Sequence, residues 1–449
     1  MPELIQVQEH ELIPYSQLSP HENWREGMRL PAQAQGLDRW FFRWQWGNSI
    51  ADDLDESFSA EQSTRAGYCA SYVIGAQWLE QETTALVVTT KGGCDRVDFL
   101  KMFSTCLYSG IESSEFAKIY EIDLDKPRIK APQLNSVLSP LIVVHFLSLV
   151  QKLIKHGLKR DYVQKEENLK KVRGHISISQ NERVNVMRKS YERVYCSYQE
   201  YSEDILENRL IKKALLYSQR MISGLQHKGE SYFAILYTLN KCLATFSNVS
   251  DQIEGWKVRS IKQHKLYKDY DDVIRIAKMI LRRYDYSITN VNTAEEECCP
   301  VFWVDMSLLY EHYVLGLLRE AYGEKVEYQC RGYTGYPDFV SYNPKIIMDT
   351  KYIPRFEQGD MDVYIARQLS GYARDRRLFR EQPNEMIPCL VIYPKEMEGE
   401  PLNPFKEKSL KQLIAQNEDF HLWGFYRVAV PLPTLDGAEK KTDADTASI

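Results

Sequence analysis

Two aspartates and a lysine flank apolar segments in the C-terminal third of the chain. Asp338 precedes one short apolar segment, and Asp349 and Lys351 follow directly on another, residues 346–348. Two carboxylates held together at a half-buried site repel each other and lose hydration, and a divalent cation relieves both costs. Mg²⁺ binds one or two carboxylates together with phosphate oxygens and water. A lysine beside the metal can orient water or stabilise the charged transition state, so these residue types predict phosphodiester hydrolysis.

Strand geometry is what would bring these three side chains together. The segment before Asp349 is apolar on both faces, which predicts a central strand. The period of two along a strand places Asp349 and Lys351 on one face, with Thr350 on the other. A turn at residues 343–344 is expected to join this strand to the preceding one. The resulting hairpin would place Asp338 beside Asp349.

Two helices are expected to lie on either side of this strand pair. Residues 302–322 have helical periodicity, and Glu311 shares the apolar face of that helix, which makes it a candidate third metal ligand. The helix after the strand pair presents Gln368 and Tyr372 one turn apart. Arginines that could contact a DNA backbone follow it, namely Arg374, Arg376, Arg377 and Arg380.

Each of these residues also has a purely structural interpretation. Asp338 and Asp349 could be a turn aspartate and a solvated strand end, and Glu311 could pair with a neighbouring arginine or tyrosine. The arginines could form an ordinary solvated helix face. The position of the aspartates and Lys351 after an apolar strand, with Glu311 before and Gln368 after, favours a catalytic site.

The composition argues against several classes of protein. The chain has 449 residues, 44% of them hydrophobic, which predicts two or three domains with their own cores. Its formal charge of −5 gives no overall basic surface for nucleic acid, although a local basic groove stays compatible with it. The sequence contains no Gly-Lys dipeptide, and therefore no Walker A phosphate loop, and neither G-x-S-x-G nor H-E-x-x-H. Nucleotide hydrolysis by this chain alone and serine-hydrolase or zincin chemistry are therefore not expected.

Cysteine spacing and hydropathy predict a cytoplasmic protein that makes no contact with a membrane. The nine cysteines include no C-x-x-C pair, which favours reduced thiols over a disulfide framework or a zinc site. Residues 1–14 mix acidic with apolar residues, so no signal peptide is expected. The longest apolar stretch, residues 137–150, is interrupted by polar residues and shorter than the roughly 20 that a membrane helix needs. It is predicted to be a buried core helix.

The distribution of patterns along the chain predicts an α+β multidomain protein. Residues 1–130 are expected to form a β-rich N-terminal region, and residues 131–285 a helical middle domain. Residues 286–435 alternate helix and strand, which is typical of an α/β core. A connecting loop is expected at residues 285–300, and the polar residues 436–449 are expected to form a flexible tail.

The order of the motifs resembles the PD-(D/E)xK nuclease superfamily. More specifically, the chain is similar to the McrC family, the nuclease subunit of McrBC-type modification-dependent restriction systems. The similarity spans most of the chain and is weakest over residues 1–65. The segments that carry it are GLKRDY (157–162), VRGHI (172–176), CSYQEYSED (196–204), ENRLIK (207–212), MSLLYE (306–311), Pro337-Asp338, Asp349-Thr350-Lys351, QLSGYA (368–373) and VAVPLP (428–433).

The resemblance implies a Mg²⁺-dependent DNA endonuclease that works in phage defence with a McrB-like AAA+ GTPase ring. Mn²⁺ is an alternative ion, and GTP or ATP would act only through the partner. Double-stranded DNA, in some systems modified, would be the substrate, and residues 1–130 the probable partner contact. By the motif match, Asp338 and Asp349 would bind metal, Lys351 would be catalytic and Gln368 would support them, while residues 286–435 would form the PD-(D/E)xK nuclease domain.

Two other functions stay open at this point. The chain could be a non-catalytic activator or adaptor whose task is to bind and stimulate an AAA+ motor. It could also be a self-sufficient DNA repair nuclease. The sequence does not tell which DNA sequence or modification is recognised, whether methylation is required, the stoichiometry with a ring, or whether Glu311 binds metal.

Overall fold

The chain divides into two compact units. The first comprises residues 1–145, 227–232 and 292–449, and the second residues 146–226 and 233–291. Most of residues 1–65, Arg380 and the predicted tail, residues 436–449, lie outside the part of the chain that the structure describes. The computed structural model describes residues 2–9, 11–14, 42–46, 49–50, 66–70, 72–91, 94, 96–110, 113–123, 125–225, 230–253, 268–289, 298–352, 363–379, 386–395, 403–416 and 422–435.

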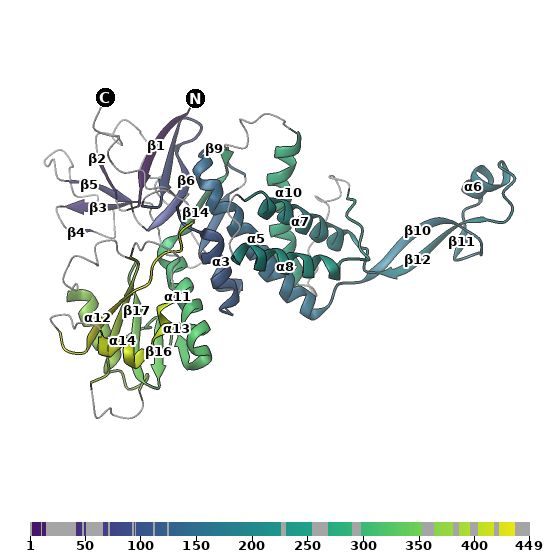
Figure 1. Cartoon of the computed structure of the whole chain (residues 1–449). Coiled ribbons are helices and arrows are strands. Elements are labelled where there is room, and N and C mark those ends of the chain that lie inside the picture. The colour runs from purple at the N-terminus through teal and green to yellow at the C-terminus, as the bar shows by residue number, and fades with distance from the viewer. Residues whose placement is uncertain are drawn as a thin grey trace. The chain divides into compact units, whose positions relative to one another are not determined.

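A five-stranded sheet of the first unit combines strands from both ends of the sequence (Figure 1). Its order is β1 (Glu3–Gln8), β7 (Thr84–Thr89), β6 (Val73–Glu80), β14 (Val301–Asp305) and β8 (Tyr120–Asp123). Only β1 and β7 are parallel among these neighbours. Gly75 in β6 has a positive φ of 148°, and a Cβ there would overlap the carbonyl oxygen of Phe302. A glycine is therefore needed at this position, where β6 pairs with β14.

The helix expected over residues 302–322 is shorter than predicted, because its first four residues belong to a strand. The aromatic and β-branched residues of β14 are buried between β6 and β8, an environment that favours strand over helix. The helix that follows, α11 (Met306–Tyr322), therefore begins only after Asp305. Asp305 caps it, with its Oδ1 accepting a hydrogen bond of 3.0 Å from the backbone N–H of Leu308.

Smaller elements surround this sheet. The strands β2 (Leu12–Pro14), β5 (Ala66–Ala70), β3 (Phe42–Trp46) and β4 (Ser49–Ile50) form a second sheet, in that order. The loop expected at residues 285–300 is wrong at both ends, because residues 285–289 belong to a helix and residues 298–299 to a short strand; residues 290–297 lie outside the described part. The remaining elements of this part are α3 (Phe99–Tyr108), α4 (Ser113–Phe116), β9 (Ile129–Lys130), which pairs with β13 (Cys298–Cys299), and η2 (Pro132–Leu134).

The C-terminal third of the chain forms a mixed five-stranded sheet. Its order is β15 (Val326–Tyr328), β16 (Phe339–Tyr342), β17 (Lys345–Thr350), β18 (Cys389–Tyr393) and β19 (Phe425–Ala429). The first three strands are antiparallel, and β17, β18 and β19 are parallel. β17 is thus the central strand, as its apolar sequence predicts. The helices of this region are η4 (Gly323–Lys325), α12 (Val363–Ala373), α13 (Pro404–Glu407) and α14 (Leu410–Gln416).

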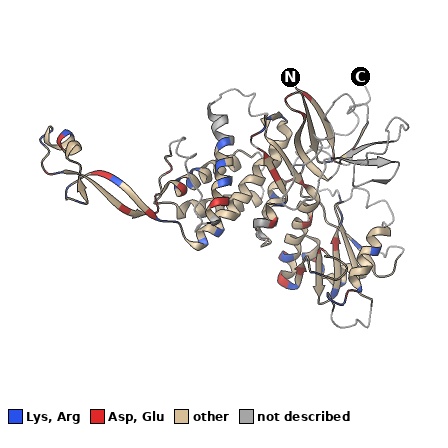
Figure 2. Cartoon of the chain, turned by 180° about the vertical axis from the view of Figure 1, so that it is seen from behind, with Lys and Arg blue, Asp and Glu red and all other residues tan. Residues whose placement is uncertain are grey.

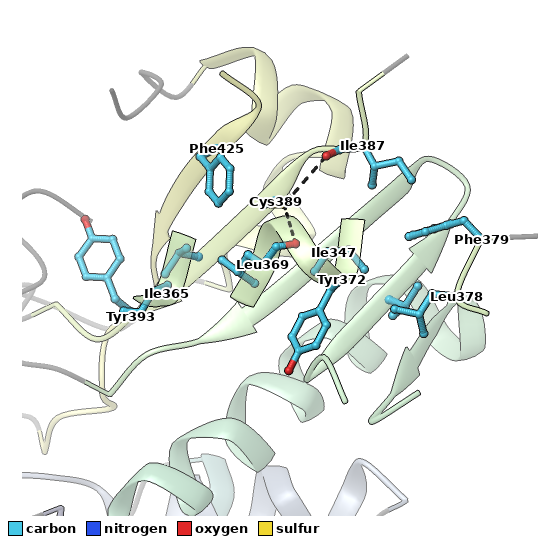
Figure 3. Packing of buried hydrophobic residues seen from close by; sticks show 12 residues of the cluster. Ile347, Ile365, Leu369, Tyr372, Leu378, Phe379, Ile387, Cys389, Tyr393 and Phe425 are labelled. Atoms are coloured by element: carbon cyan, nitrogen blue, oxygen red, sulfur yellow. Dashed lines mark hydrogen bonds between the residues drawn. The ribbon is translucent and has the colours of Figure 1, made fainter. Parts of the chain in front are cut away.

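Helix α12 packs on one face of this sheet (Figure 3). Ile365, Leu369 and Tyr372 on the helix join Ile347 of β17 and Cys389 of β18 in one buried cluster. The Cys389 thiol also donates to the backbone oxygen of Leu369, with the two atoms 3.6 Å apart. This apolar contact fixes α12 beside the C-terminal end of β17, where Asp349 lies. The mixed α+β architecture predicted from the sequence is therefore present.

The second unit contains helices, as the sequence predicts for the middle of the chain. Their buried faces consist of residues at three-to-four spacing, such as Leu210, Ala214 and Leu215. The helices are α7 (Leu206–Ser223), most of α8 (Glu230–Thr245), α10 (Lys268–Thr289) and the C-terminal part of α5 (Asn135–His156).

The second unit also contains a long strand pair that the expectation of a helical middle domain omits. β10 (Asp161–Leu169) and β12 (Val194–Ser202) are antiparallel and extend away from the helices (Figure 1). Residues of both charges lie along the two strands (Figure 2), and Lys165 pairs with Glu200 at 2.5 Å. Because this pair buries few apolar residues, it lacks the alternating pattern by which strands are recognised. The segment that connects the two strands contains β11 (His175–Ile176), α6 (Ile178–Asn181) and η3 (Glu182–Val186).

Helix α5 contains the apolar stretch that was predicted to be a core helix. Among the described residues, residues 132–156 form the single segment long and apolar enough to cross a membrane by length and composition. Its most apolar window is 72% buried within the protein. A buried core helix passes the same test, so the prediction of a core helix is supported.

A buried carboxylate joins the N-terminal sheet to the residue after Lys351. Glu9 is 5% exposed and accepts hydrogen bonds of 3.0 and 3.2 Å from the hydroxyl of Tyr352. It also accepts a bond of 3.1 Å from the backbone N–H of Lys91. Burial raises the pKa of Glu9 from 4.5 to about 7, and these hydrogen bonds oppose the rise only in part. The N-terminal sheet and the segment after β17 are thereby tied together.

Stability is expected to fall between pH 4.5 and 7 because of Glu9. The folded state binds the Glu9 proton more tightly than the unfolded state, so its contribution is complete below pH 4.5 and is lost as pH rises through about 7. The free energy of unfolding should fall by at most about 3 kcal/mol over this range. Glu9→Gln should remove this component from a plot of Tm against pH. Glu3→Gln, at an exposed position of β1, is the control and should keep it. Identical profiles for all three proteins would contradict the assignment.

Candidate active site

The β16–β17 hairpin brings the two predicted aspartates to the same end of the sheet. The strands pair with Phe339 opposite Met348, so the same register continued by one residue places Asp338 opposite Asp349. The turn lies at residues 343–344, as predicted. Asp338 and Asp349 therefore come together through local hairpin geometry.

Asp349 and Lys351 form an ion pair at the end of β17. Asp349 is 2% exposed, and the Nζ of Lys351 lies 2.5 Å from its Oδ2. Burial raises the pKa of Asp349, and the positive charge and hydrogen bond of Lys351 reduce the rise. The buried carboxylate of Asp349 therefore has the Lys351 ammonium as its close partner.

Asp338 is held by Thr350. Its Oδ2 accepts bonds of 2.7 Å from the backbone N–H and 2.6 Å from the hydroxyl of Thr350. The sequence places Thr350 on the face opposite Asp349 and Lys351, yet its hydroxyl bonds Asp338, a residue of the site. Burial, followed by repulsion from Asp349 and Glu311, raises the pKa of Asp338 well above its usual range.

Glu311 reaches the site from α11 and has a neutral partner. The side-chain N–H of Gln329 donates to its Oε1 at 3.1 Å, and Tyr328 also lowers its pKa. Burial and, to a smaller extent, repulsion from Asp349 outweigh these bonds, so the pKa of Glu311 is raised. Glu311 therefore has a polar partner, as its structural interpretation requires, and also interacts electrostatically with an aspartate of the site.

Gln368 and Tyr372 lie one turn apart on α12 and contact each other. The side-chain N–H of Gln368 donates to the Tyr372 hydroxyl at 3.0 Å. The charges of Asp349, Asp338 and Lys351 all act on the pKa of Tyr372, which burial raises above its usual value. The helix thus presents this pair to the charged residues of the strand ends.

Lys351 keeps its proton in this environment. Burial alone lowers its pKa, but the negative charges of Asp349 and Asp338 outweigh burial and raise it. The site therefore holds one ammonium group among three carboxylates, each of which is destabilised by burial. A cation bound there would relieve that repulsion.

The residues fit a Mg²⁺ ion that uses only a few protein ligands. Among the described residues, no group of three or more His, Cys, Asp and Glu side chains is arranged to hold a metal. Mg²⁺ usually keeps several waters and needs only one or two carboxylates. Asp349 and Asp338 are the carboxylates that would supply these, and Glu311 is a further candidate beside them.

Two residues of the site were not predicted. Thr350 positions Asp338, and its place between Asp349 and Lys351 was the available signal. Gln329 has a left-handed backbone, φ 46°. Its backbone N–H donates to the backbone carbonyl oxygen of Asp338 at 2.9 Å, and its side-chain N–H donates to Glu311. Nothing in the sequence around Gln329 indicates this double contact, because it depends on how α11 packs against β15.

The Thr350 hydroxyl is expected to matter for cleavage. Thr350→Val removes one of the two bonds to Asp338 and should lower the cleavage rate about tenfold, the effect of about 1.4 kcal/mol in the transition state. Thr350→Ser keeps a hydroxyl at the same place and should retain most of the rate. Single-turnover cleavage of a plasmid measures both. Equal rates for the two variants would show that the backbone N–H alone holds Asp338.

The comparisons with known proteins identify a family. A family model described as "McrBC 5-methylcytosine restriction system component" matches residues 87–368. None of the curated proteins is similar enough to match. The sequence match confirms the resemblance to McrBC-type systems.

Two solved structures from Thermococcus gammatolerans have a distantly similar chain path. One is a half-complex from a tetradecameric assembly of McrB AAA+ hexamers with bound McrC, with 14% identity, a TM-score of 0.36 and coverage of 95% of this chain and 94% of that chain. The other is a McrBC complex, with 13% identity, a TM-score of 0.30 and coverage of 77% and 91%. The family assignment rests on the sequence match.

Proposed function

This chain belongs to the family of McrBC 5-methylcytosine restriction system components, and we propose that it is the subunit that cuts double-stranded DNA. The observation that carries the proposal is the group at the end of β17. There the buried Asp349 has the ammonium of Lys351 2.5 Å from its Oδ2, and Asp338 lies opposite it on the hairpin. This order of residues on a central strand and hairpin supports the resemblance of the sequence to the PD-(D/E)xK nucleases.

The chain's own residues have separate tasks in the proposed reaction. Asp338 and Asp349 would hold Mg²⁺, which supplies Lewis-acid stabilisation of phosphate charge and a more acidic water. Thr350 orients Asp338. Lys351 keeps a proton and offers positive charge to the phosphate as negative charge develops. Gln368 and Tyr372 orient each other beside these residues, as supporting groups.

A McrB-like AAA+ GTPase ring is the partner we infer. The chain has no Walker A loop, so any nucleotide hydrolysis in the system must come from another subunit. Residues 1–130 are the proposed contact with it. In the described part of the chain, the thiols of five cysteines form no disulfide, which supports a reducing, cytoplasmic location: Cys106, Cys196, Cys242, Cys330 and Cys389.

The test is cleavage of modified and unmodified plasmids by this chain, with and without a McrB-like AAA+ protein, in Mg²⁺ and in EDTA. Cleavage that requires Mg²⁺, partner and GTP together supports the proposal. Cleavage by the chain alone in Mg²⁺ would favour a self-sufficient repair nuclease instead. Mn²⁺ in place of Mg²⁺ should also support cleavage.

A non-catalytic activator is the second candidate. It is favoured by one observation, that no group of three or more potential metal ligands is preassembled among the described residues. An activator would stimulate GTP hydrolysis by the partner normally and would show no Mg²⁺-dependent nicking. The GTPase rate and the nicking rate of the same preparation therefore distinguish the two functions.

A further inference from the structure

A tight turn before Asp338 is fixed to the end of helix α12 by one buried carboxylate. Asp375 is 4% exposed, and its Oδ2 accepts bonds of 2.5 and 2.8 Å from the backbone N–H groups of Tyr333 and Thr334. The Thr334 hydroxyl donates to the same oxygen at 3.0 Å, and the backbone N–H of Arg377 donates to Oδ1 at 2.8 Å. Asp375 thereby fixes both the turn and the residues after α12.

Two glycines let the turn lie against the helix. The N–H of Gly332 donates to the Gly335 oxygen at 2.8 Å, which closes the turn. Gly335 has a positive φ of 140°, and a Cβ there would lie 2.9 Å from the Tyr372 hydroxyl. At Gly332 a Cβ would lie 2.6 Å from the Oδ2 of Asp375. The turn therefore touches the same tyrosine that Gln368 contacts in the candidate active site.

The outward side of this assembly is basic and aromatic. Tyr333 is 78% exposed and Tyr336 is 56% exposed, and the guanidinium of Arg377 lies 5.8 Å from the centre of the Tyr333 ring. Four arginines are exposed around the turn, and none of them forms an ion pair with a residue in the described part of the chain: Arg331, Arg374, Arg376 and Arg377.

The acidic residue in this group does not neutralise the arginines. Burial raises the pKa of Asp375, but its hydrogen bonds to Thr334, Arg377 and Tyr333 outweigh burial and lower it, so Asp375 stays ionised. Its charge is directed into backbone N–H groups and away from the arginine side chains. The outward surface keeps its positive charge, although the whole chain is acidic.

We propose that this surface, the Asp375 surface, binds the phosphate backbone of DNA beside the bond that is cut, with the four arginines and the two exposed tyrosines as its contacts. The inference rests on the proposed nuclease function. Arginine and tyrosine side chains are common contacts of DNA phosphates, which position a duplex without reading its sequence. The turn is joined to Asp338 through Tyr336 and Pro337 alone. A duplex held there is delivered to the carboxylates of the site, and Asp375 acts as a positioning residue.

The first test is the salt dependence of DNA binding by the full-length chain, measured in EDTA with a short unmodified duplex. Replacing Arg374, Arg376 and Arg377 together with alanine should weaken binding at least tenfold. The plot of log K against log salt concentration has a negative slope, and its magnitude should decrease by about 2 to 3, since each lost phosphate contact removes about 0.9. The control is Arg183→Ala, Arg188→Ala and Lys189→Ala, which removes the same charge from exposed positions of the second unit.

The second test separates an ordered surface from simple attraction between charges. Asp375→Asn removes a negative charge, so non-specific attraction alone predicts tighter binding. We expect weaker binding, because both carboxylate oxygens of Asp375 accept hydrogen bonds, and asparagine would turn its N–H₂ toward either the turn or the backbone N–H of Arg377. Asp375→Glu, which keeps the charge and a carboxylate, should bind better than Asp375→Asn. Thermal unfolding of each variant verifies that the chain is folded.

The outcomes distinguish this inference from the proposed function. If the triple arginine variant binds and cuts like the wild type, the Asp375 surface is not a DNA contact, although the nuclease assignment stands. If Asp375→Asn binds more tightly, the ordered turn has no role. If the wild-type protein with its partner neither binds nor cuts DNA, both proposals fail.

Discussion

Asp349→Asn is expected to reduce DNA cleavage at least about a thousandfold while leaving the chain folded and able to bind its partner. The substitution removes the buried charge that the proposed Mg²⁺ site depends on, and losses of this size are typical when an essential electrostatic group is removed. Single-turnover plasmid cleavage and stimulation of the partner's GTPase measure the two effects. Retained cleavage would remove Asp349 from the site.

The same variant should be no less stable than the wild type at pH 8, since Asp338 remains as a negative neighbour of Lys351. Burial raises the pKa of Asp349, so the folded state loses stability as pH rises through that pKa, and asparagine removes this loss. Asp251→Asn, which changes an exposed aspartate outside the proposed partner contact, is the matched control. It should leave both cleavage and Tm unchanged. A large fall in Tm for Asp349→Asn would show that the charge is needed for folding, because Lys351 would then depend on it.

Lys351→Met is expected to lower cleavage by about a hundredfold to a thousandfold and, unlike Asp349→Asn, to destabilise the protein. The rate falls because positive charge beside the phosphate is lost. Stability falls because Asp349 and Asp338 then remain buried without a positive neighbour, a loss that is typically about 3–5 kcal/mol for a broken buried pair. Cleavage rate and Tm at pH 8 are the measurements.

A lysine on the same strand provides the control for this prediction. Lys345→Met changes the first residue of β17, at the opposite end from the site, and should leave the cleavage rate near that of the wild type. Lys351→Arg restores the charge with a planar group, and we expect it to recover stability better than rate. If Lys351→Met cuts normally, the lysine is only a structural partner of Asp349.

The elements nearest the candidate site could be predicted because local patterns encode them. The apolar segment before Asp349, the turn before Lys345 and the one-turn spacing of Gln368 and Tyr372 are all visible in consecutive residues. A strand of period two and a helix of 3.6 residues per turn translate such spacing directly into shared faces.

Predictions failed where packing between distant segments overrides a local pattern. Residues 302–305 continue the periodicity of α11, yet they form β14 because β6 and β8 bury them on both sides. The hydroxyl of Thr350 bonds Asp338 across the hairpin, although alternation along β17 places Thr350 opposite Asp349. The β10–β12 pair was omitted because it encloses no apolar core of its own.

The sequence by itself determined which residue types are present and which of them share a strand or a helix turn: Asp349 with Lys351, and Gln368 with Tyr372. Only the tertiary structure decided that Glu311 meets Gln329, that Glu9 is buried against Tyr352, and that Asp375 fixes the turn before Asp338. The physical reason is that spacing along one helix or strand fixes the direction in which its side chains point. Burial, and the charge interactions that depend on it, arise from contacts between residues far apart in the chain.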